Sequence, residues 1–435
     1  MSSAAQITSI EYPVWSMAVC LLLIYLSPFV SLALNYIAFA ICLYRVVRYD
    51  ESVFAIDYCI LAGSSYIFLS TGRVSLLAWL SIIFALWHII KNGAQCNTPF
   101  VLLIILLDYM LIRTGTAINN FVLCFSPLLL LYVLLSTQKE TGIVPNALAF
   151  CGNVILSSTY ALVFRDSSQI RSLLGNEVVA YWGSSQTRFQ GLFRDPNYYM
   201  TMLLISIALI VVLFMNQYIS RKVFVGSISV LVFFGALTYS KTFLIVLAIF
   251  VLFLIIRLFL SGHFFIGIGS ILFTTLAAIV LSDTLFSVVL YRIVSSDNLY
   301  DLTTGRSELL IEYLTEITKS ASTFFFGAGL SADILERGTH NLFLEIVYYL
   351  GFIGLLLTVV YFISLLRLLS RKFEYKGANP NGLFRYVVLI VFLLLFCTLQ
   401  GMTFVITYVM LYLSILATEI SPNTKLSRQE KSFED

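Results

Sequence analysis

The stretch HNLFLEIVYYLGFIGLLLTVVYFISLL, residues 340–366, decides the fold of this chain. A polar pair, His340-Asn341, stands at the mouth of a segment that is almost wholly apolar and long enough to cross a bilayer as a helix. An ionisable group at a membrane edge costs free energy, and a histidine can exchange a proton near neutral pH. The pair therefore predicts a catalytic site. The alternative is an interfacial helix cap followed by two helix-packing glycines, Gly351 and Gly354.

The whole chain shares this apolar character. Of its 435 residues, 60% are hydrophobic and only 11% are charged, which excludes an ordinary water-soluble protein. Apolar runs of roughly 15 to 25 residues recur, and a bilayer core takes about 20 helical residues. We therefore predict an all-α integral membrane protein, a helical bundle with 12 to 14 membrane-spanning helices. The net charge of +3 gives no reason to expect a nucleic-acid partner.

The number of spans depends on two breaks. Pro28 either divides residues 14–44 into two helices or kinks one long helix. Residues 384–419 are too long for one crossing, and Gln400-Gly401 is a natural break within them. The spans are expected near 14–28, 29–44, 54–70, 74–90, 100–113, 117–135, 143–164, 198–216, 222–239, 242–260, 264–282, 341–366, 384–399 and 403–419.

Basic residues predict the orientation, because cytoplasmic loops carry an excess of lysine and arginine. One consistent topology follows from placing these residues inside: Arg45, Arg48, Lys91, Lys139, Arg221, Lys222, Arg257, Arg367, Arg371, Lys372, Lys376, Lys425, Arg428 and Lys431. Both termini are then cytoplasmic, and two long loops, 165–197 and 283–340, lie outside. Residues 1–422 form a single transmembrane domain, and residues 423–435 form a tail that we expect to be disordered.

Few residues inside the apolar runs suggest chemistry. The seven cysteines form no CxxC or Cys/His cluster, so we predict neither a disulfide framework nor a zinc site. Asp57 and Asp108 fall within spans, where they either relay protons or bind ions, or form interior hydrogen bonds near a helix end. His88 and His263 lie toward the inner side, away from the outer loops.

The second outer loop contains GRSELLIEYLTEI, residues 305–317, which predicts an amphipathic helix beginning at Arg306. Its apolar side chains share one face, whereas Glu308, Glu312 and Glu316 share another. Such a helix either lies on the membrane surface or caps the bundle.

Two arginines in the first outer loop suggest an anion site. Arg188 and Arg194 precede a helix that Asp195 or Asn197 caps, with Pro196 near its start. The positive end of a helix attracts an anion, and the arginines would add to that attraction. The alternative is a capped, turn-rich helix entry.

Three further outer positions carry charge. Lys241 lies in a very short turn, Ser240-Lys241-Thr242, where positive charge is normally avoided; the alternative is a lysine that reaches the interface along the helix. Arg306 at a helix start is unfavourable toward the helix dipole unless an anion compensates it, and the alternative is an exposed loop arginine. Glu345 shares a helix face with Asn341 and either orients polar groups near the site or forms a buried hydrogen bond.

Together these segments place cations, one histidine and apolar surface on the outer side. Cations match the charge that builds up on a diphosphate leaving group, and a histidine can deprotonate a hydroxyl nucleophile. Apolar surroundings accommodate a lipid tail. The sequence therefore predicts a site for a lipid diphosphate, with no metal and no other cofactor.

The pattern His340-Asn341-x9-Gly351-x2-Gly354 resembles a signature of the bacterial O-antigen polymerase and O-antigen ligase superfamily. Ser240-Lys241-Thr242, Gly305-Arg306 with its amphipathic helix, and Phe326-Gly327-Ala328-Gly329 occur in the family's order. Residues 188–197 resemble the segment that precedes a central span in polymerase members. The resemblance covers roughly residues 185–420, and the first half of the chain is similar only in hydropathy.

The resemblance implies a glycosyltransferase at the periplasmic face of the bacterial inner membrane. Its donor and acceptor would be undecaprenyl-diphosphate-linked oligosaccharides, and a chain-length regulator and a flippase would be partners in the pathway. In similar ligases two arginines hold the diphosphate and a histidine assists the acceptor. By motif these roles fall on Arg306 and His340, with Asn341 beside it. The first arginine position is Lys241, which loses the planar two-pronged grip, and Arg188 would supply the fork instead.

Three functions stay open from the sequence. Residues 191–197 and Lys241 favour a polymerase, which joins two lipid-linked glycans. The alternative is a ligase, which transfers the glycan to lipid A-core. A third possibility of another class is a transporter of lipid-linked glycans, which would line a midplane cavity with charges.

Overall fold

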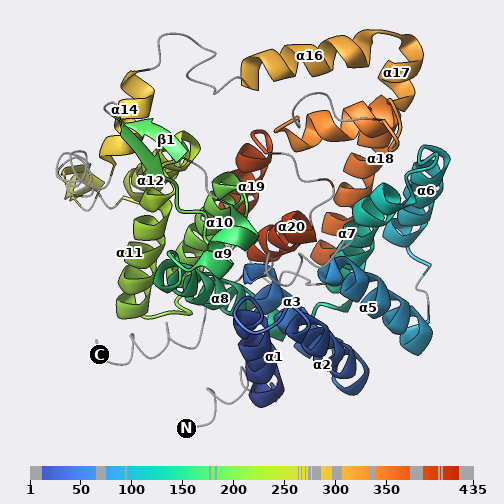
Figure 1. Cartoon of the computed structure of the whole chain (residues 1–435), viewed down its shortest axis with the longest axis horizontal. Coiled ribbons are helices and arrows are strands. Elements are labelled where there is room, and N and C mark those ends of the chain that lie inside the picture. The colour runs from blue at the N-terminus through green and yellow to red at the C-terminus, as the bar shows by residue number, and fades with distance from the viewer. Residues whose placement is uncertain are drawn as a thin grey trace.

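The computed structural model describes residues 12–64, 75–93, 96–175, 178–181, 184–262, 264, 265, 267–269, 271, 272, 276, 286–295, 306–332, 339–372, 386–399, 402 and 405–420. Over these residues the protein is almost entirely helical (Figure 1). One antiparallel hairpin adds the only described strands, with Val178 opposite Thr187. The expected all-α class is confirmed.

The helices and strands follow in chain order. They are α1 Val14–Leu26, α2 Leu34–Arg48, α3 Glu51–Gly63, α5 Leu76–Asn92, α6 Thr98–Ile112, α7 Ile118–Thr137, η2 Glu140–Gly142, α8 Ile143–Val163, α9 Ser168–Leu174, β1 Val178–Tyr181, β2 Ser184–Thr187, α10 Pro196–Met215, α11 Arg221–Leu237, α12 Lys241–Leu260, α14 Ser287–Val294, α16 Arg306–Thr318, α17 Ala321–Phe326, α18 Leu342–Lys372, α19 Val387–Phe396 and α20 Val405–Ala417.

Several helices have the length and composition to cross a membrane. Among the described residues, α7, α8, α10, α12 and α18 qualify, and α1, α5, α6, α19 and α20 are shorter apolar helices. These helices indicate a membrane protein. The count of 12 to 14 crossings stays a prediction, because only five described helices are long enough by themselves. The break at Pro28 divides residues 14–44 into two helices, α1 and α2.

The centre of the bundle is α10. Within its most apolar stretch 83% of the helix is buried, against 22% for α12, which therefore lies at the periphery. Helices α8, α11, α19 and α20 pack around α10 (Figure 1). Both segments expected to be outer loops contain regular structure: α9 and the hairpin in the first, and α14, α16 and α17 in the second.

The decisive stretch 340–366 is not one straight helix. Gly351 has a φ of 71° and a ψ of −176°, so the residues before and after it run in different directions (Figure 1). The expected span over 341–366 is present as part of α18, but it consists of two helical segments that meet at Gly351. The break exposes carbonyl groups, and other segments satisfy them: Ala328 N donates to Tyr348 O at 2.7 Å, and the Tyr109 hydroxyl donates to Leu350 O at 2.6 Å.

The contact between Arg45 and Asp57 corrects the expectation for Arg45 and decides between the two alternatives for Asp57. Arg45 is not an inner-loop charge, since it is 1% exposed and its Nε lies 2.6 Å from Asp57 Oδ2. The Tyr12 hydroxyl also donates to Asp57, and the rings of Tyr12 and Tyr49 each lie 5.3 Å from the Arg45 guanidinium. Of the two alternatives for Asp57, the structure therefore shows an interior hydrogen-bonded residue.

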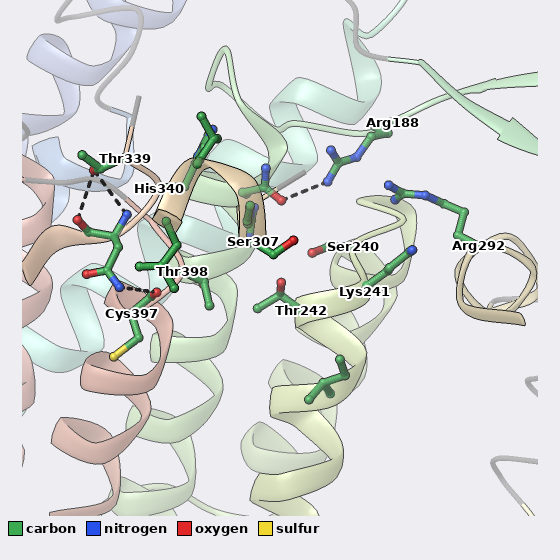
Figure 2. A pocket seen from close by; sticks show the side chains of 16 residues that line it. Arg188, Ser240, Lys241, Thr242, Arg292, Ser307, Thr339, His340, Cys397 and Thr398 are labelled. Carbon is green, nitrogen blue, oxygen red and sulfur yellow. Dashed lines mark hydrogen bonds between the residues drawn. The ribbon is translucent and has the colours of Figure 1, made fainter. Parts of the chain in front are cut away.

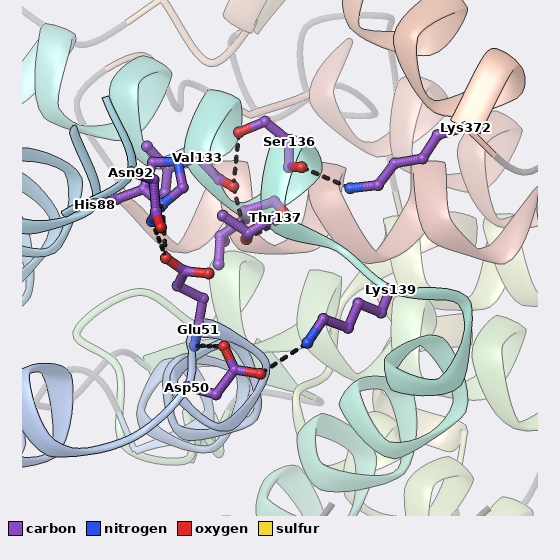
Figure 3. Close-up of polar contacts among 10 residues, drawn as sticks. Asp50, Glu51, His88, Asn92, Val133, Ser136, Thr137, Lys139 and Lys372 are labelled. Carbon is purple, nitrogen blue, oxygen red and sulfur yellow. Dashed lines mark hydrogen bonds and ion pairs between the residues drawn. The ribbon is translucent and has the colours of Figure 1, made fainter. Parts of the chain in front are cut away.

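A polar cluster joins the helix ends remote from His340 (Figure 3). Lys139 Nζ lies 2.8 Å from Asp50 Oδ2 and lowers the pKa of that carboxyl. His88 Nδ1 lies 2.9 Å from Glu51 Oε1, and Lys372 Nζ donates to Ser136 O at 2.6 Å. Lys139 and Lys372, which the sequence places on one side of the membrane, thus lie at the same end of the bundle.

Candidate functional site

A cavity of about 500 Å³, called here the main cavity, is lined by many polar side chains (Figure 2). It brings together segments that are far apart in the sequence. Its lining residues are Arg188, Asn197, Ser240, Lys241, Thr242, Ile245, Arg292, Arg306, Ser307, Leu309, Leu310, Thr339, His340, Asn341, Cys397 and Thr398. None of these described lining residues is acidic, whereas four carry a permanent positive charge.

The turn between α11 and α12 forms one wall. Ser240 caps α12 by accepting a hydrogen bond from Phe243 N, so the helix begins at Lys241 and places it at the cavity. Tyr239 has a φ of 49°, a backbone conformation that bulky residues rarely adopt. Its carbonyl accepts from Arg292 Nη1 at 2.5 Å. This contact holds both the turn and the arginine in place.

Arg188 is positioned by two hydrogen bonds. Its Nε donates to Thr238 O at 2.8 Å, and its Nη2 donates to Asn197 Oδ1 at 3.2 Å. Asp195 caps α10 through Asn197 N at 2.7 Å, with Pro196 in the first turn, which confirms the expected helix start. Figure 2 shows Arg188, Lys241 and Arg292 gathered on one side of the cavity, away from His340.

Arg306 is the first described residue of α16, and the expected helix over residues 306–317 is present. Burial lowers the pKa of its guanidinium; the nearby Asp195 carboxylate acts in the opposite direction, and Arg188 adds to the lowering. Burial thus makes the charged guanidinium of Arg306 less favourable than it is in water, and an anionic ligand would offset that cost. Gly305 lies outside the described residues.

His340 precedes α18 with a φ of 47°, a left-handed conformation that is uncommon for residues other than glycine, although histidine adopts it more often than most. Such strain persists where the surroundings determine it, and it is concentrated at functional sites. Next to it, Asn341 caps the helix by accepting from Leu344 N at 3.0 Å, and its Nδ2 donates to Cys397 O at 3.0 Å. Asn341 therefore fixes the backbone that presents the imidazole.

Three expected site residues lie apart from the cavity lining. Arg194 is exposed, and its Nε donates to Leu173 O at 3.4 Å. Glu345 is buried and accepts a hydrogen bond from Met402 N at 3.0 Å. Of the two alternatives for Glu345, the structure therefore shows the buried hydrogen bond. Asp195 acts through its cap and through its charge near Arg306.

Sequence reasoning missed Arg292. It lies on α14, a helix of eight residues within a segment that looked like a polar loop. The available signal was an arginine within the apolar run SVVLYRIV. Within the described ranges, no three His, Cys, Asp or Glu side chains cluster so as to hold a metal ion.

The lining residues of the main cavity suit a ligand that carries both an anionic group and an apolar group. Arg188, Lys241 and Arg292 occupy one side, and the hydroxyl groups of Ser240, Thr242 and Ser307 lie between them and His340 (Figure 2). The side chains of Ile245, Leu309 and Leu310 add apolar surface. No protein-family model matches the chain, and no curated protein and no solved structure shows significant similarity to it. A function must therefore be inferred from the chemistry of the main cavity.

Proposed function

We propose that the chain is a glycosyltransferase of the bacterial inner membrane that polymerises a surface polysaccharide. It would transfer an undecaprenyl-diphosphate-linked glycan onto a second lipid-linked repeat unit at the periplasmic face. One observation supports this most directly: Lys241, Arg306 and His340, from three remote segments, line the same cavity.

The cations suit the leaving group of such a reaction. Charge builds up on the diphosphate as the glycosidic bond to it breaks, and fixed cations stabilise that charge best in a partly desolvated site. Arg188, Arg292 and Arg306 offer planar forks, whereas Lys241 offers a point charge. In this proposal, guanidinium groups from other segments compensate for the lysine at position 241.

The imidazole of His340 is suited to activate the acceptor sugar. A sugar hydroxyl on the acceptor attacks the anomeric carbon of the donor, the imidazole takes the hydroxyl proton, and the diphosphate leaves with the bonding electron pair. In the proposal the base lies on one side of the cavity and Arg188, Lys241 and Arg292 lie on the other, with space for the reacting atoms between them (Figure 2).

The position of the cavity supports a lipid-linked substrate. Ile245 lines it and belongs to α12, the least buried of the five long apolar helices, so a lipid tail can leave along that helix. Lys139 and Lys372 lie at the far end of the bundle, and lysine-rich ends are usually cytoplasmic. In this proposal the main cavity and both outer segments face the periplasm, and both termini are cytoplasmic.

The test is glycan transfer by purified protein in vesicles with lipid-linked repeat units. Wild type is expected to make polymer, and Arg306→Gln is expected to lower the initial rate about 100-fold. Lys319→Gln is the matched control, because Lys319 is an exposed cation just beyond the far end of α16. No polymer from wild type, or equal rates for wild type and Arg306→Gln, would refute the proposal.

The ligase alternative has one supporting observation, since Arg306 and His340 of the ligase-like motif share the cavity. The two reactions differ in acceptor and can be separated in a strain that lacks this chain. Loss of a polymerase leaves single repeat units on the lipopolysaccharide. Loss of a ligase leaves none, and lipid-linked polymer accumulates.

A further inference from the structure

A second cavity, of about 150 Å³, lies at the opposite end of α18 from His340 and is called here the Arg367 cavity. Ser364, Arg367 and Arg371 of α18 form one wall. Asn97 and Thr98 at the start of α6 form the other, where the two helices pack in opposite directions. No acidic side chain is among its described lining residues.

Its two arginines differ from Lys139 and Lys372 at the same end of the bundle. Arg367 and Arg371 are one helical turn apart and exposed, and neither makes a hydrogen bond or ion pair with any described residue. By contrast, Lys139 pairs with Asp50, and Lys372 donates to Ser136 O. Two like charges at this spacing repel each other, which costs stability unless an anion lies between them.

The opposite wall increases this positive potential. Asn97 caps α6 by accepting from Phe100 N at 3.0 Å, so the positive end of the helix dipole is directed toward the cavity. The Thr98 side chain adds a hydroxyl donor. Phosphate oxygens accept hydrogen bonds from guanidinium groups, from hydroxyl groups and from the N–H groups at a helix start, and this cavity offers all three kinds of donor.

We propose that the Arg367 cavity binds a phosphate group, with Arg367 and Arg371 as a two-fork clamp. The part of α18 after Gly351 is about as long as a hydrocarbon core of about 30 Å. In the orientation proposed above, with Gly351 at the periplasmic boundary, both arginines lie at the level of the cytoplasmic headgroups. We assign the phosphate to an anionic phospholipid headgroup. A soluble phosphate would use the same contacts, so the test includes both.

The experiment measures binding to full-length protein in detergent by calorimetry. Dihexanoyl phosphatidylglycerol is compared with dihexanoyl phosphatidylcholine and with inorganic phosphate. Arg367→Gln and Arg371→Gln are each expected to weaken phosphatidylglycerol binding at least about tenfold. Arg48→Gln is the matched control, because Arg48 is an exposed arginine in the last turn of α2 that lines no described cavity.

The outcomes separate the possibilities. Preference for phosphatidylglycerol, lost in the two cavity variants and kept in Arg48→Gln, supports the lipid site. Equal binding of inorganic phosphate, lost in the same two variants, supports the clamp and moves the ligand to a soluble phosphate. Equal weakening by Arg48→Gln, or no difference among the variants, overturns the proposal. Arg371→Lys, which keeps the charge without the fork, should fall between wild type and Arg371→Gln.

Discussion

Gly327 and Gly351 pack backbone against backbone: a Cβ atom on either one would lie 2.5 Å from the backbone nitrogen of the other. Both also have positive φ angles, 77° and 71°. The contact holds the segment after α17 against the break in α18, where Gly329 N donates to Tyr349 O at 3.0 Å. Two glycines that the sequence marked as a signature are thus required by close approach and by backbone conformation.

Gly351→Ala is expected to destabilise the protein by at least about 2 kcal/mol, because the new methyl group meets backbone atoms and alanine disfavours this φ. Thermal unfolding of the detergent-solubilised protein measures the effect. Gly226→Ala is the control, since a Cβ at that helical position meets nothing within 4 Å. Equal melting temperatures for the two variants would contradict the packing argument.

His340→Asn should separate chemistry from backbone strain. Asparagine tolerates the left-handed conformation that His340 adopts, but it carries no titratable ring. We expect the rate of glycan transfer to fall by about 100- to 10,000-fold while the melting temperature and donor binding stay unchanged. A variant that retains the wild-type rate would remove the imidazole from the mechanism.

Arg306→Lys should change the pH dependence of transfer. Burial lowers the pKa of the cation at this position, and lysine starts from a pKa of about 10.4, well below that of arginine. The lysine variant therefore loses its proton, and with it the charge that binds diphosphate, at a lower pH than wild type. Rates measured between about pH 7 and pH 10 should decline earlier on the alkaline side for the variant. Superimposable profiles would argue against a charge requirement at Arg306.

Arg292→Gln tests the cation that the sequence did not reveal. The substitution removes one guanidinium group from the main cavity and one hydrogen bond to Tyr239 O. We expect KM for the lipid-linked donor to rise about tenfold, because a charge-assisted contact is lost. If only the melting temperature changes, Arg292 acts on the α11–α12 turn and does not contact substrate.

Arg45→Met should be more harmful than removal of the whole ion pair. It leaves the Asp57 carboxylate buried without its two guanidinium hydrogen bonds, at a cost of about 3–5 kcal/mol. The double variant Arg45→Met with Asp57→Leu should recover most of that loss. Arg48→Met, at an exposed position three residues on, serves as the control and should change stability by less than about 0.5 kcal/mol. Additive losses in the double variant would show that the two side chains do not depend on each other.

Helix starts were predictable because they depend on residues within one turn. Asp195 with Pro196 marks the start of α10 through local hydrogen bonding, and the periodicity after Arg306 marks α16; both helices are where the sequence places them. The start of α12 differs, because the sequence placed Lys241 in the turn, whereas Ser240 caps the helix and Lys241 is its first residue. The convergence of Lys241, Arg306 and His340 followed from assigning their segments to one side of a bundle.

Long-range packing could not be predicted in the same way. The partner of Arg45 lies on another helix, and the partner of Gly351 lies beyond an undescribed stretch of chain. Neither pairing leaves a periodic trace in the sequence. Glycines spaced like those at 351 and 354 look like helix-packing residues, so the change of direction at Gly351 was not expected.

Helices α16 and α17 form an arm that is fixed against α18 at Gly327, so the length of this arm determines where Arg306 lies. Arg306 stands at the far end of that arm, across 13 residues of α16 and the six of α17. One residue inserted into α16 would turn Arg306 by about 100° and shift it by about 1.5 Å relative to the anchor. The length of this arm, as much as the identity of its first residue, therefore sets where the guanidinium meets its ligand.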